Sequence, residues 1–315
     1  MRKIFLFFLL SIAVLTAGCS TPGPKKSAQG SEMRTVRIAY LPITHALPLF
    51  AEKELLSTDD NVQIELIKYG SWPELMDALN TGKVDGASVL IELAVKAREQ
   101  GIDVRAAALG HKDGNVIIGG NDINSVEDLR GKIFAIPHKQ STHNLLLQQL
   151  LREHGMSPQD LTVVELSPPE MPAGLAQGQI SGYCVAEPFG AKAIALGKGH
   201  ILAKADELWP DSLCCALVFN GRFVEEHHEL ARETVAKYLA ASRYLEKNPE
   251  EQPRIAQIYL KAKAKVIEKS LQFIRYNDLA ITREAYKELT SRMQEAGLIR
   301  QVPDYEEFVD STLLP

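Results

Sequence analysis

The sequence predicts an α/β protein built of two lobes, each a mostly parallel sheet flanked by helices. Two observations predict this class. Apolar strands alternate with amphipathic helical segments along the middle of the chain, and one strand-helix-strand-helix-strand order occurs there twice at a nearly constant offset. About 280 residues follow the N-terminal region, which is enough chain for two hydrophobic cores.

The N-terminal region has the layout of a secretory signal. Residues 1–19, MRKIFLFFLLSIAVLTAGC, contain a basic start, an apolar run and then small residues. The apolar run is too short to be a permanent membrane span. The segment Leu-Thr-Ala-Gly before Cys19 resembles the lipobox of bacterial lipoproteins, although an ordinary secretory signal with a nearby cysteine is the alternative. We therefore expect a signal peptide at 1–18 and lipidation of Cys19.

The segment after Cys19 and the net charge indicate where the protein works. Residues 19–33 are rich in Ser, Pro, Gly and Lys and have no hydrophobic period, as is typical of a flexible tether. Without Arg2 and Lys3, 33 basic residues stand against 40 acidic ones, a charge of −7. Because there is no basic stripe, nucleic acid is not an expected partner. The predicted location is the extracytoplasmic face of the cell membrane, with a lipid anchor.

The middle of the chain repeats itself. Residues 37–56 (RIAYLPITHALPLFAEKELL) and 133–151 (IFAIPHKQSTHNLLLQQLL) each contain a strand, a Pro-containing loop and a Thr-His pair that begins a helix. A second strand and a short helix ending at a glycine follow in both copies. Aligning Thr44 with Thr142 gives an offset of 98, and aligning Gly82 with Gly178 gives 96. The agreement predicts two copies of one βαβαβ unit.

The repeat also suggests where a ligand would bind. In open α/β sheets, ligands lie beyond the carboxyl ends of the strands, where the next helices begin. Thr44-His45 and Thr142-His143 occupy such helix starts, whose unpaired N–H groups suit anionic or polar groups. The alternative is that the threonines are ordinary N-caps and the histidines ordinary first-turn residues.

The remaining segments complete the two lobes. SLCCALVFN (212–220) is interpreted as a strand that returns to the first lobe. Residues 229–247 and 282–298 carry apolar residues at helical spacing and are predicted to pack on that lobe, with PDYEEF (303–308) as a docking segment. The predicted first lobe is 34–120 plus 212–315, and the predicted second lobe is 121–211.

Four stretches carry a family resemblance: YGSWPELMDALNTGKVDGASVL, STHNLLLQQLLREHGMSP, SPPEMPAGLAQGQISGYCVAEPF and ELWPD. From about Arg34 onward the chain resembles the substrate-binding lipoproteins of ABC importers for nitrate, bicarbonate, taurine, alkanesulfonates and thiamine precursors. The resemblance implies the two-lobed periplasmic-binding-protein type II fold. It also implies a monomer that delivers a small solute to a membrane permease and its ATPase subunit.

The resemblance also implies a set of pocket residues. In the nitrate and bicarbonate subgroup the pocket uses a Trp, a polar amide, the His of a Thr-His pair and a Lys. Trp72, Asn115 and His143 match the first three. The Lys position falls on Cys215, and its acidic neighbour on Cys214. A thiol lacks the cation that a small anion needs, so anion binding in the subgroup's manner is not expected.

The full predicted ligand-binding set is Thr44, His45, Trp72, Ser88, Asn115, Thr142, His143, Glu187 and Cys215. Glu187 in AEPF offers an acceptor or a negative charge, or else is a solvated helix start. A pyrimidine-type thiamine precursor suits Trp72 and Glu187, whereas a sulfonate suits the two helix starts. A nitrate-like anion is the third candidate solute. No cofactor is predicted.

Three cysteines remain after Cys19, an odd number and not a disulfide framework. We expect one side chain of the pair Cys214-Cys215 to pack in the lobe and Cys215 to face the cleft, because successive strand residues point to opposite faces. A vicinal disulfide is not expected, and pairing with Cys184 stays open. His111 in GHKDGN is expected to be a loop histidine.

Two other functions are alternatives. Cys214, Cys215, His45, His111 and His143 could converge as a soft-metal site, such as one for zinc, although no pair has a metal-motif spacing. A pyrimidine-synthase-like enzyme of the same fold is less favoured, because relatives of that kind act in the cytosol. No G-x-S-x-G, phosphate loop or H-E-x-x-H motif is present. The sequence therefore predicts a binding protein and not an enzyme.

Overall fold

The computed structural model describes residues 34–55 and 62–315. The predicted signal peptide, the predicted lipidation at Cys19 and the tether lie outside the described residues. The described chain belongs to one compact unit, Met33–Pro315. None of the helices within the described ranges is long and apolar enough to cross a membrane.

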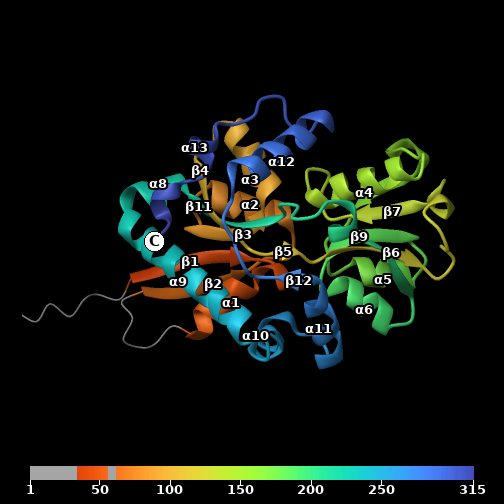
Figure 1. Ribbon diagram of the computed structural model, residues 1–315, viewed down its shortest axis with the longest axis horizontal. Coiled ribbons are helices and arrows are strands. Elements are labelled where there is room, and N and C mark those ends of the chain that lie inside the picture. The colour runs from red at the N-terminus through yellow and green to blue at the C-terminus, as the bar shows by residue number, and fades with distance from the viewer. Residues whose placement is uncertain (1–33, 56–61) are drawn as a thin grey trace, which may run out of the picture. The chain divides into compact units, whose positions relative to one another are not determined.

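The first sheet has five strands in the order β2-β1-β3-β11-β4. Helices α2 and α3 lie on one side of it, and α1 and α9 lie on the other (Figure 1). The strands are β1 Arg34–Tyr40, β2 Val62–Lys68, β3 Gly86–Leu90, β4 Val104–Leu109 and β11 Cys215–Asn220, and the helices are α1 Leu47–Leu55, α2 Trp72–Asn80, α3 Ile91–Glu99 and α9 His228–Lys247.

The second sheet also has five strands, in the order β10-β6-β9-β7-β8. Helix α4 lies on one side of it, and α5 and α6 lie on the other (Figure 1). The strands are β6 Asn115–Gly120, β7 Ile133–Ile136, β8 Thr162–Glu165, β9 Gly182–Ala186 and β10 Gly199–Lys204, and the helices are α4 Thr142–Glu153, α5 Met171–Ala176, α6 Phe189–Ala195 and α7 Ala205–Leu208.

The predicted repeat is confirmed. Strands β2-β1-β3 and β8-β7-β9 have the same order, and all four pairings among them are parallel. Gly82 and Gly178, which end the equivalent helices α2 and α5, both have φ of 71°. This left-handed conformation is readily available to glycine because it has no Cβ.

Each sheet is mostly parallel, as predicted, with one strand reversed: β11 runs antiparallel to β3 and β4, and β6 runs antiparallel to β9 and β10. Both strands are reached when the chain crosses from the other sheet, so neither follows the helical crossover that parallel pairing requires. Residues 115–120, assigned above to the first lobe, pair in the second sheet.

Two segments carry the chain between the sheets, one between β4 and β6 and one between β10 and β11. The first contains β5 (Lys112–Asp113), which pairs with β12 (Ile274–Arg275) in a small separate sheet. The Arg275 guanidinium lies 2.7 Å from the Asp113 carboxylate. A C-terminal segment therefore holds the first crossing in place.

The C-terminal region packs on the first sheet, as predicted. Phe308 is fully buried, and Val309 forms a parallel bridge with Ala106 of β4. The remaining helices are α8 Gly221–Glu226, α10 Glu251–Leu260, α11 Ala264–Ser270, α12 Arg283–Glu295 and α13 Tyr305–Phe308, and the 3₁₀ turns are η1 Thr44–Ala46, η2 Glu127–Leu129, η3 Pro158–Asp160, η4 Leu271–Phe273 and η5 Ser311–Leu313.

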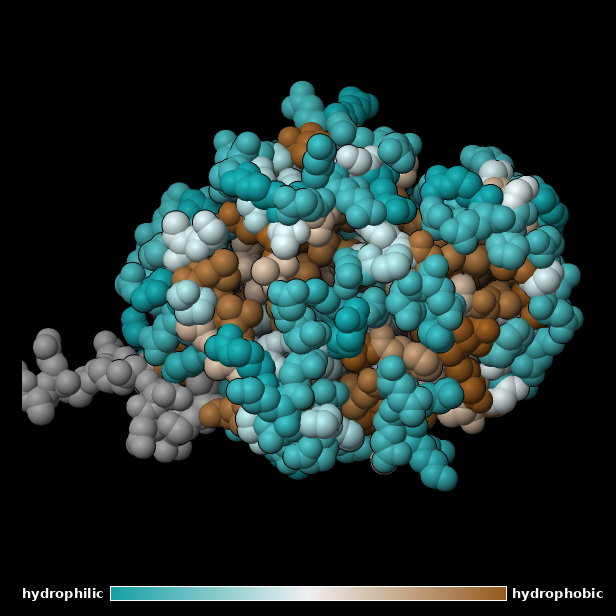
Figure 2. Space-filling view, viewed as in Figure 1, coloured by the Kyte–Doolittle hydropathy of each residue, from teal (hydrophilic) through white to brown (hydrophobic). Residues whose placement is uncertain are grey.

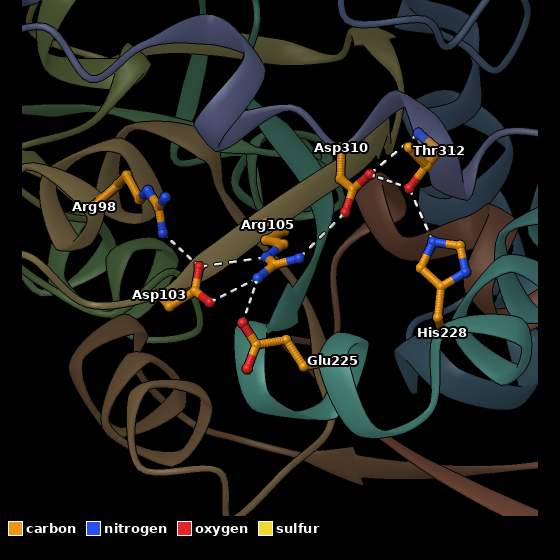
Figure 3. Close-up of polar contacts among 7 residues, drawn as sticks. All are labelled: Arg98, Asp103, Arg105, Glu225, His228, Asp310 and Thr312. Atoms are coloured by element: carbon orange, nitrogen blue, oxygen red, sulfur yellow. Dashed lines mark hydrogen bonds and ion pairs between the residues drawn. The ribbon is translucent and has the colours of Figure 1, made fainter.

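A polar network fastens this C-terminal segment to the edge strand β4. The Arg105 guanidinium contacts the carboxylates of Asp103, Glu225 and Asp310 (Figure 3). The imidazole of His228 lies 2.9 Å from the Thr312 hydroxyl in the same view. On the face drawn in Figure 2, hydrophilic residues dominate, and the hydrophobic residues lie mostly in recesses between them.

Candidate functional site

The two Thr-His pairs lie at the carboxyl ends of equivalent parallel strands. Thr44 and His45 follow β1 in the turn η1, and Thr142 and His143 begin α4 after β7. Neither threonine is an N-cap. Ser141 caps α4 by accepting a hydrogen bond from the Asn144 N–H. The capping interpretation of the threonines is therefore wrong, and their hydroxyl groups bond elsewhere.

Each threonine forms hydrogen bonds with residues that belong to the other lobe or lead into its sheet. The N–H and Oγ1 of Thr44 donate to the Glu187 carbonyl at the end of β9, at 2.8 and 3.0 Å. Thr142 Oγ1 lies 2.5 Å from the Leu213 carbonyl and also contacts the Glu92 carboxyl. The hydrogen bonds of Thr44 and Thr142 thus join the two sheets, and we call them the two threonine contacts.

The contact among Thr142, Glu92 and Leu213 requires a particular proton arrangement. A hydroxyl has one proton, so when Thr142 donates to the Leu213 carbonyl it must accept from Glu92. Only a protonated carboxyl can donate. Burial raises the pKa of Glu92 to about 8, which keeps it protonated at neutral pH.

Four buried residues form a cluster at the junction of the sheets: His45, His111, Cys214 and Cys215. One potential ligand atom from each lies within 4.8 Å of all the others. His45 Nδ1 is 3.4 Å from Cys215 Sγ and 3.8 Å from Cys214 Sγ, and the two sulfurs are 3.9 Å apart. The rings of His45 and His111 stack with centroids 3.5 Å apart.

Each position in this cluster follows from the topology. His45 follows β1, and His111 lies in the first crossing segment. Cys214 ends the second crossing, and Cys215 begins β11. The cluster therefore forms where the chain passes twice between the sheets, which explains how residues about 170 positions apart come into contact.

Two expectations are wrong, one about the pair Cys214-Cys215 and one about His111. The thiols of Cys214 and Cys215 do not point to opposite sides, because β11 starts at Cys215 and strand alternation does not apply to Cys214. His111 is not an ordinary loop histidine: its exposed fraction is 1% and it stacks on His45. Cys184, Cys214 and Cys215 are all free thiols in the structure.

The other predicted residues are buried, and several have unpartnered polar atoms. Trp72 begins α2, Ser88 lies on β3 and Asn115 begins β6. Neither the Trp72 indole N–H nor the amide atoms of Asn115 have a hydrogen-bond partner, and both ring nitrogens of His143 are likewise unpaired. Buried polar groups normally have partners, so this concentration of unpaired donors and acceptors is typical of a binding site.

Glu187 is a helix-start acid, but it is buried and not solvated. Its Oε2 accepts hydrogen bonds from the Ala191 N–H at 2.9 Å and from the Ser270 hydroxyl at 3.3 Å, while Oε1 has no partner. Its exposed fraction is 0%. Its carbonyl serves the first threonine contact, so the residue helps to join the sheets whatever else it binds.

The charge state of the site differs from that of an anion pocket. Burial lowers the pKa of His111 and His143 to about 3. Burial, helped by His111 and His143, holds the pKa of His45 well below its usual value. Burial also raises the pKa of the Cys215 thiol. At neutral pH these side chains are uncharged electron-pair donors, and none of them is a cation.

The ligand-binding set derived from the sequence omits three residues that the structure brings into the site. His111 and Cys214 complete the cluster, and Glu92 holds Thr142. The sequence points to His111 and Cys214 in one way only, because both belong to the set of cysteines and histidines that could form a soft-metal site. Glu92 carries no such signal, because an acid in the first turn of a helix is usually a solvated end residue.

The buried carboxyl of Glu187 gives a pH prediction. Burial raises its pKa from 4.5 to about 7, against the lowering effect of the hydrogen bonds from Ala191 and Ser270 and the charge of Lys269. A raised pKa in the folded chain contributes stability that is complete below pH 4.5 and is lost as the pH rises through about 7. Glu187→Gln abolishes this titration.

We expect the unfolding free energy of wild type, relative to Glu187→Gln, to fall by about 2 kcal/mol between roughly pH 5 and pH 8. Urea denaturation at several pH values measures it. The exposed Glu226→Gln is the control and should follow wild type at every pH. A wild-type curve parallel to that of Glu187→Gln would show that Glu187 does not titrate in this range.

Comparisons with known proteins agree with this arrangement. A family model described as the NMT1-like family matches residues 29–260. The chain is 38% identical to a solved structure of the ligand-binding component of an ABC-type import system from Staphylococcus aureus with zinc bound, covering 89% of this chain and 97% of that one, with a TM-score of 0.85.

Two curated relatives come from cyanobacteria. The nitrate/nitrite binding protein NrtA of Nostoc sp. is 24% identical, covering 88% of this chain and 75% of that protein. The bicarbonate transport ATP-binding protein CmpC of Synechocystis sp. is 30% identical over 57% of this chain, which spans only 30% of that longer protein. The predicted two-lobed periplasmic-binding-protein fold is confirmed by the solved structures. The chain belongs to the NMT1-like family.

Proposed function

We propose that this protein is the solute-binding component of an ABC importer and that its lobes close on a small solute at the junction of the two sheets. The observation that supports it best is that His111 and His143, which both act on the pKa of His45, and Asn115, which follows the Gly114 bonded to His45, have buried polar atoms without a partner. Members of this family serve as binding proteins in transport, which favours binding over catalysis.

The two threonine contacts support closure of one lobe on the other. They join elements of the first sheet to elements of the second through side chains that are fully buried. A solute that bridges both lobes stabilises the closed state by the contacts it makes only there. The proposed binding residues are the nine predicted from the sequence, with His111, Cys214 and Glu92 added.

The charge state of the site bears on the solute. A nitrate-like anion or a sulfonate gains most from a cation, whereas the imidazoles, thiols and amide of this site are uncharged donors of electron pairs. Such groups suit an electron-pair acceptor or a hydrogen-bond donor, including an aminopyrimidine. Because the Staphylococcus aureus relative was solved with zinc bound, zinc belongs among the solutes to test.

The proposal also covers the location, oligomeric state and transport partners of the protein. We propose that the chain is lipid-anchored through Cys19 at the extracytoplasmic face of the membrane, acts as a monomer and delivers its solute to a permease coupled to an ATPase. The cyanobacterial relatives support the transport assignment, since one is a binding protein and the other an ATP-binding protein of a bicarbonate transport system.

A melting screen tests the proposed function. A solute at 100 times its Kd should raise the free energy of unfolding by about 2.7 kcal/mol. The screen contains nitrate, bicarbonate, taurine, an alkanesulfonate, an aminopyrimidine, riboflavin and zinc. For any solute of the screen other than zinc, His143→Asn should abolish the shift, whereas the control His138→Asn, a half-buried histidine in the preceding loop, should retain it.

Two outcomes would contradict the proposal. One is a chain whose melting temperature none of these solutes changes and whose acid extract contains a product of catalysis, which would favour the enzyme alternative. The other is a shift caused by a solute other than zinc that survives His143→Asn unchanged, which would place that solute away from the junction of the sheets.

A further inference from the structure

We propose that His45, His111, Cys214 and Cys215 bind a soft metal ion, of which Zn²⁺ is the representative, and that this ion is the solute. The inference rests on the proposed function, because it names the class of solute taken at the same junction. It is drawn from the four side chains themselves, whose donor atoms lie within 4.8 Å of one another.

The distances within the cluster match tetrahedral coordination. Zinc bonds of about 2.3 Å to sulfur and about 2.0 Å to nitrogen place two sulfurs about 3.8 Å apart and a sulfur and a nitrogen about 3.6 Å apart. The two sulfurs are 3.9 Å apart, and His45 Nδ1 lies 3.4 and 3.8 Å from them. Three donor atoms are therefore close to tetrahedral spacing, and the fourth, on His111, lies within 4.8 Å of them. The His111 ring stacks on His45 and would have to turn for its lone pair to reach the same ion.

The remaining hydrogen bonds orient both imidazoles toward the cluster. His45 Nε2 donates to the Gly114 carbonyl at 3.3 Å, so Nδ1 presents its lone pair to the sulfurs. His111 Nδ1 donates to the Asp113 carbonyl at 2.7 Å, which leaves the lone pair of its buried Nε2 without a partner. Metal-binding histidines are held in this way, with the other ring nitrogen bonded to a carbonyl or carboxylate.

The donor set selects the class of ion. Two thiolates and two imidazoles in tetrahedral arrangement suit Zn²⁺ and other soft ions, while Mg²⁺ and Ca²⁺ require oxygen ligands. All four side chains are at most 1% exposed, so a bound ion would be shielded from water. The sulfurs are free and 3.9 Å apart, compared with about 2.05 Å in a disulfide.

The experiment measures metal content and affinity on the full-length chain, purified with a phosphine reductant and without chelator. We expect about one Zn²⁺ per chain by elemental analysis, and loss of it in Cys214→Ala and Cys215→Ala. Zinc affinity in each variant should fall at least about 100-fold, since even outer-shell partners of metal ligands are worth 10–100-fold. Competition with a chromophoric chelator reports the affinity.

Cys184→Ala is the matched control, because Cys184 is equally buried and lies outside the four-residue cluster. It should retain zinc with wild-type affinity. A second measurement needs no variant: Co²⁺ added to the wild-type chain should give the sulfur-to-cobalt absorption band of thiolate coordination, and Zn²⁺ should displace it. Folding of each variant is checked by circular dichroism.

Failure of this inference can be told apart from failure of the proposed function. If neither Zn²⁺, Co²⁺ nor Cu⁺ binds, while an organic solute raises the melting temperature through His143, the metal site is excluded and the solute-binding role stands. If zinc binds equally well to wild type, Cys214→Ala and Cys215→Ala, the ion lies elsewhere and the inference is also overturned.

Discussion

Thr142→Val should lower the free energy of unfolding by about 3 kcal/mol, because it leaves the Leu213 carbonyl and the protonated Glu92 carboxyl buried without a partner. Valine has nearly the shape of threonine, with a methyl group in place of the hydroxyl. Since this contact joins the two lobes in the proposed closed state, solute affinity should fall together with stability. Urea denaturation and a binding titration measure the two effects.

Thr234→Val is the matched control for this substitution. Thr234 is also fully buried, but its hydroxyl donates to the Leu230 carbonyl one turn earlier in the same helix, α9. Its loss should cost less than about 1 kcal/mol and leave solute affinity unchanged, because helix carbonyls keep their backbone partner. Equal losses in the two variants would refute the special role of the Thr142 contact.

Gly110→Ala should cost about 3 kcal/mol, the upper end of the range for overpacking a core. A Cβ at this position would lie 2.7 Å from the His45 carbonyl oxygen and 3.4 Å from the Cys215 carbonyl oxygen. Both are backbone atoms, so the strain cannot be relieved by a side-chain rotation. His45 and Cys215 would move apart, and zinc affinity should fall with stability.

Gly70→Ala provides the comparison, since the nearest atom to its added Cβ is a Glu74 carboxylate oxygen at 3.8 Å, an ordinary contact. It should unfold like wild type and bind zinc equally well. Chemical denaturation and the chelator competition assay measure both variants. A Gly110→Ala chain as stable as Gly70→Ala would mean that the backbone at the cluster moves freely, contrary to its packing.

Much of the fold could be predicted because it is encoded locally. Hydrophobic period and glycine positions mark each strand and helix of the repeat, and the matching φ angles at Gly82 and Gly178 show that the same local geometry recurs. The one reversed strand in each sheet could not be predicted in this way. Whether β6 and β11 run parallel depends on how the chain crosses between sheets, and strand periodicity is the same in both directions.

The candidate site, like the fold, could be predicted from the sequence only in part. The Thr-His pairs were found because repetition and the carboxyl-end rule point to them, and the structure places them at the junction of the sheets. Cys214 and His111 were assigned other environments, since their orientation depends on where β11 begins and on the conformation of the first crossing segment. Glu92 lies in the first turn of α3, where acidic residues are usually solvated, so its burial does not follow from the sequence pattern.

Hydrophobic periodicity and the internal repeat are enough to predict two βαβαβ units and a C-terminal helical region packed on the first. The surroundings of Cys214 and Cys215, next to His45 and His111, follow only from the folded chain. Metal coordination and inter-lobe hydrogen bonds depend on distances of a few ångströms between residues far apart in the chain, and those distances arise only when two sheets and two crossing segments pack together.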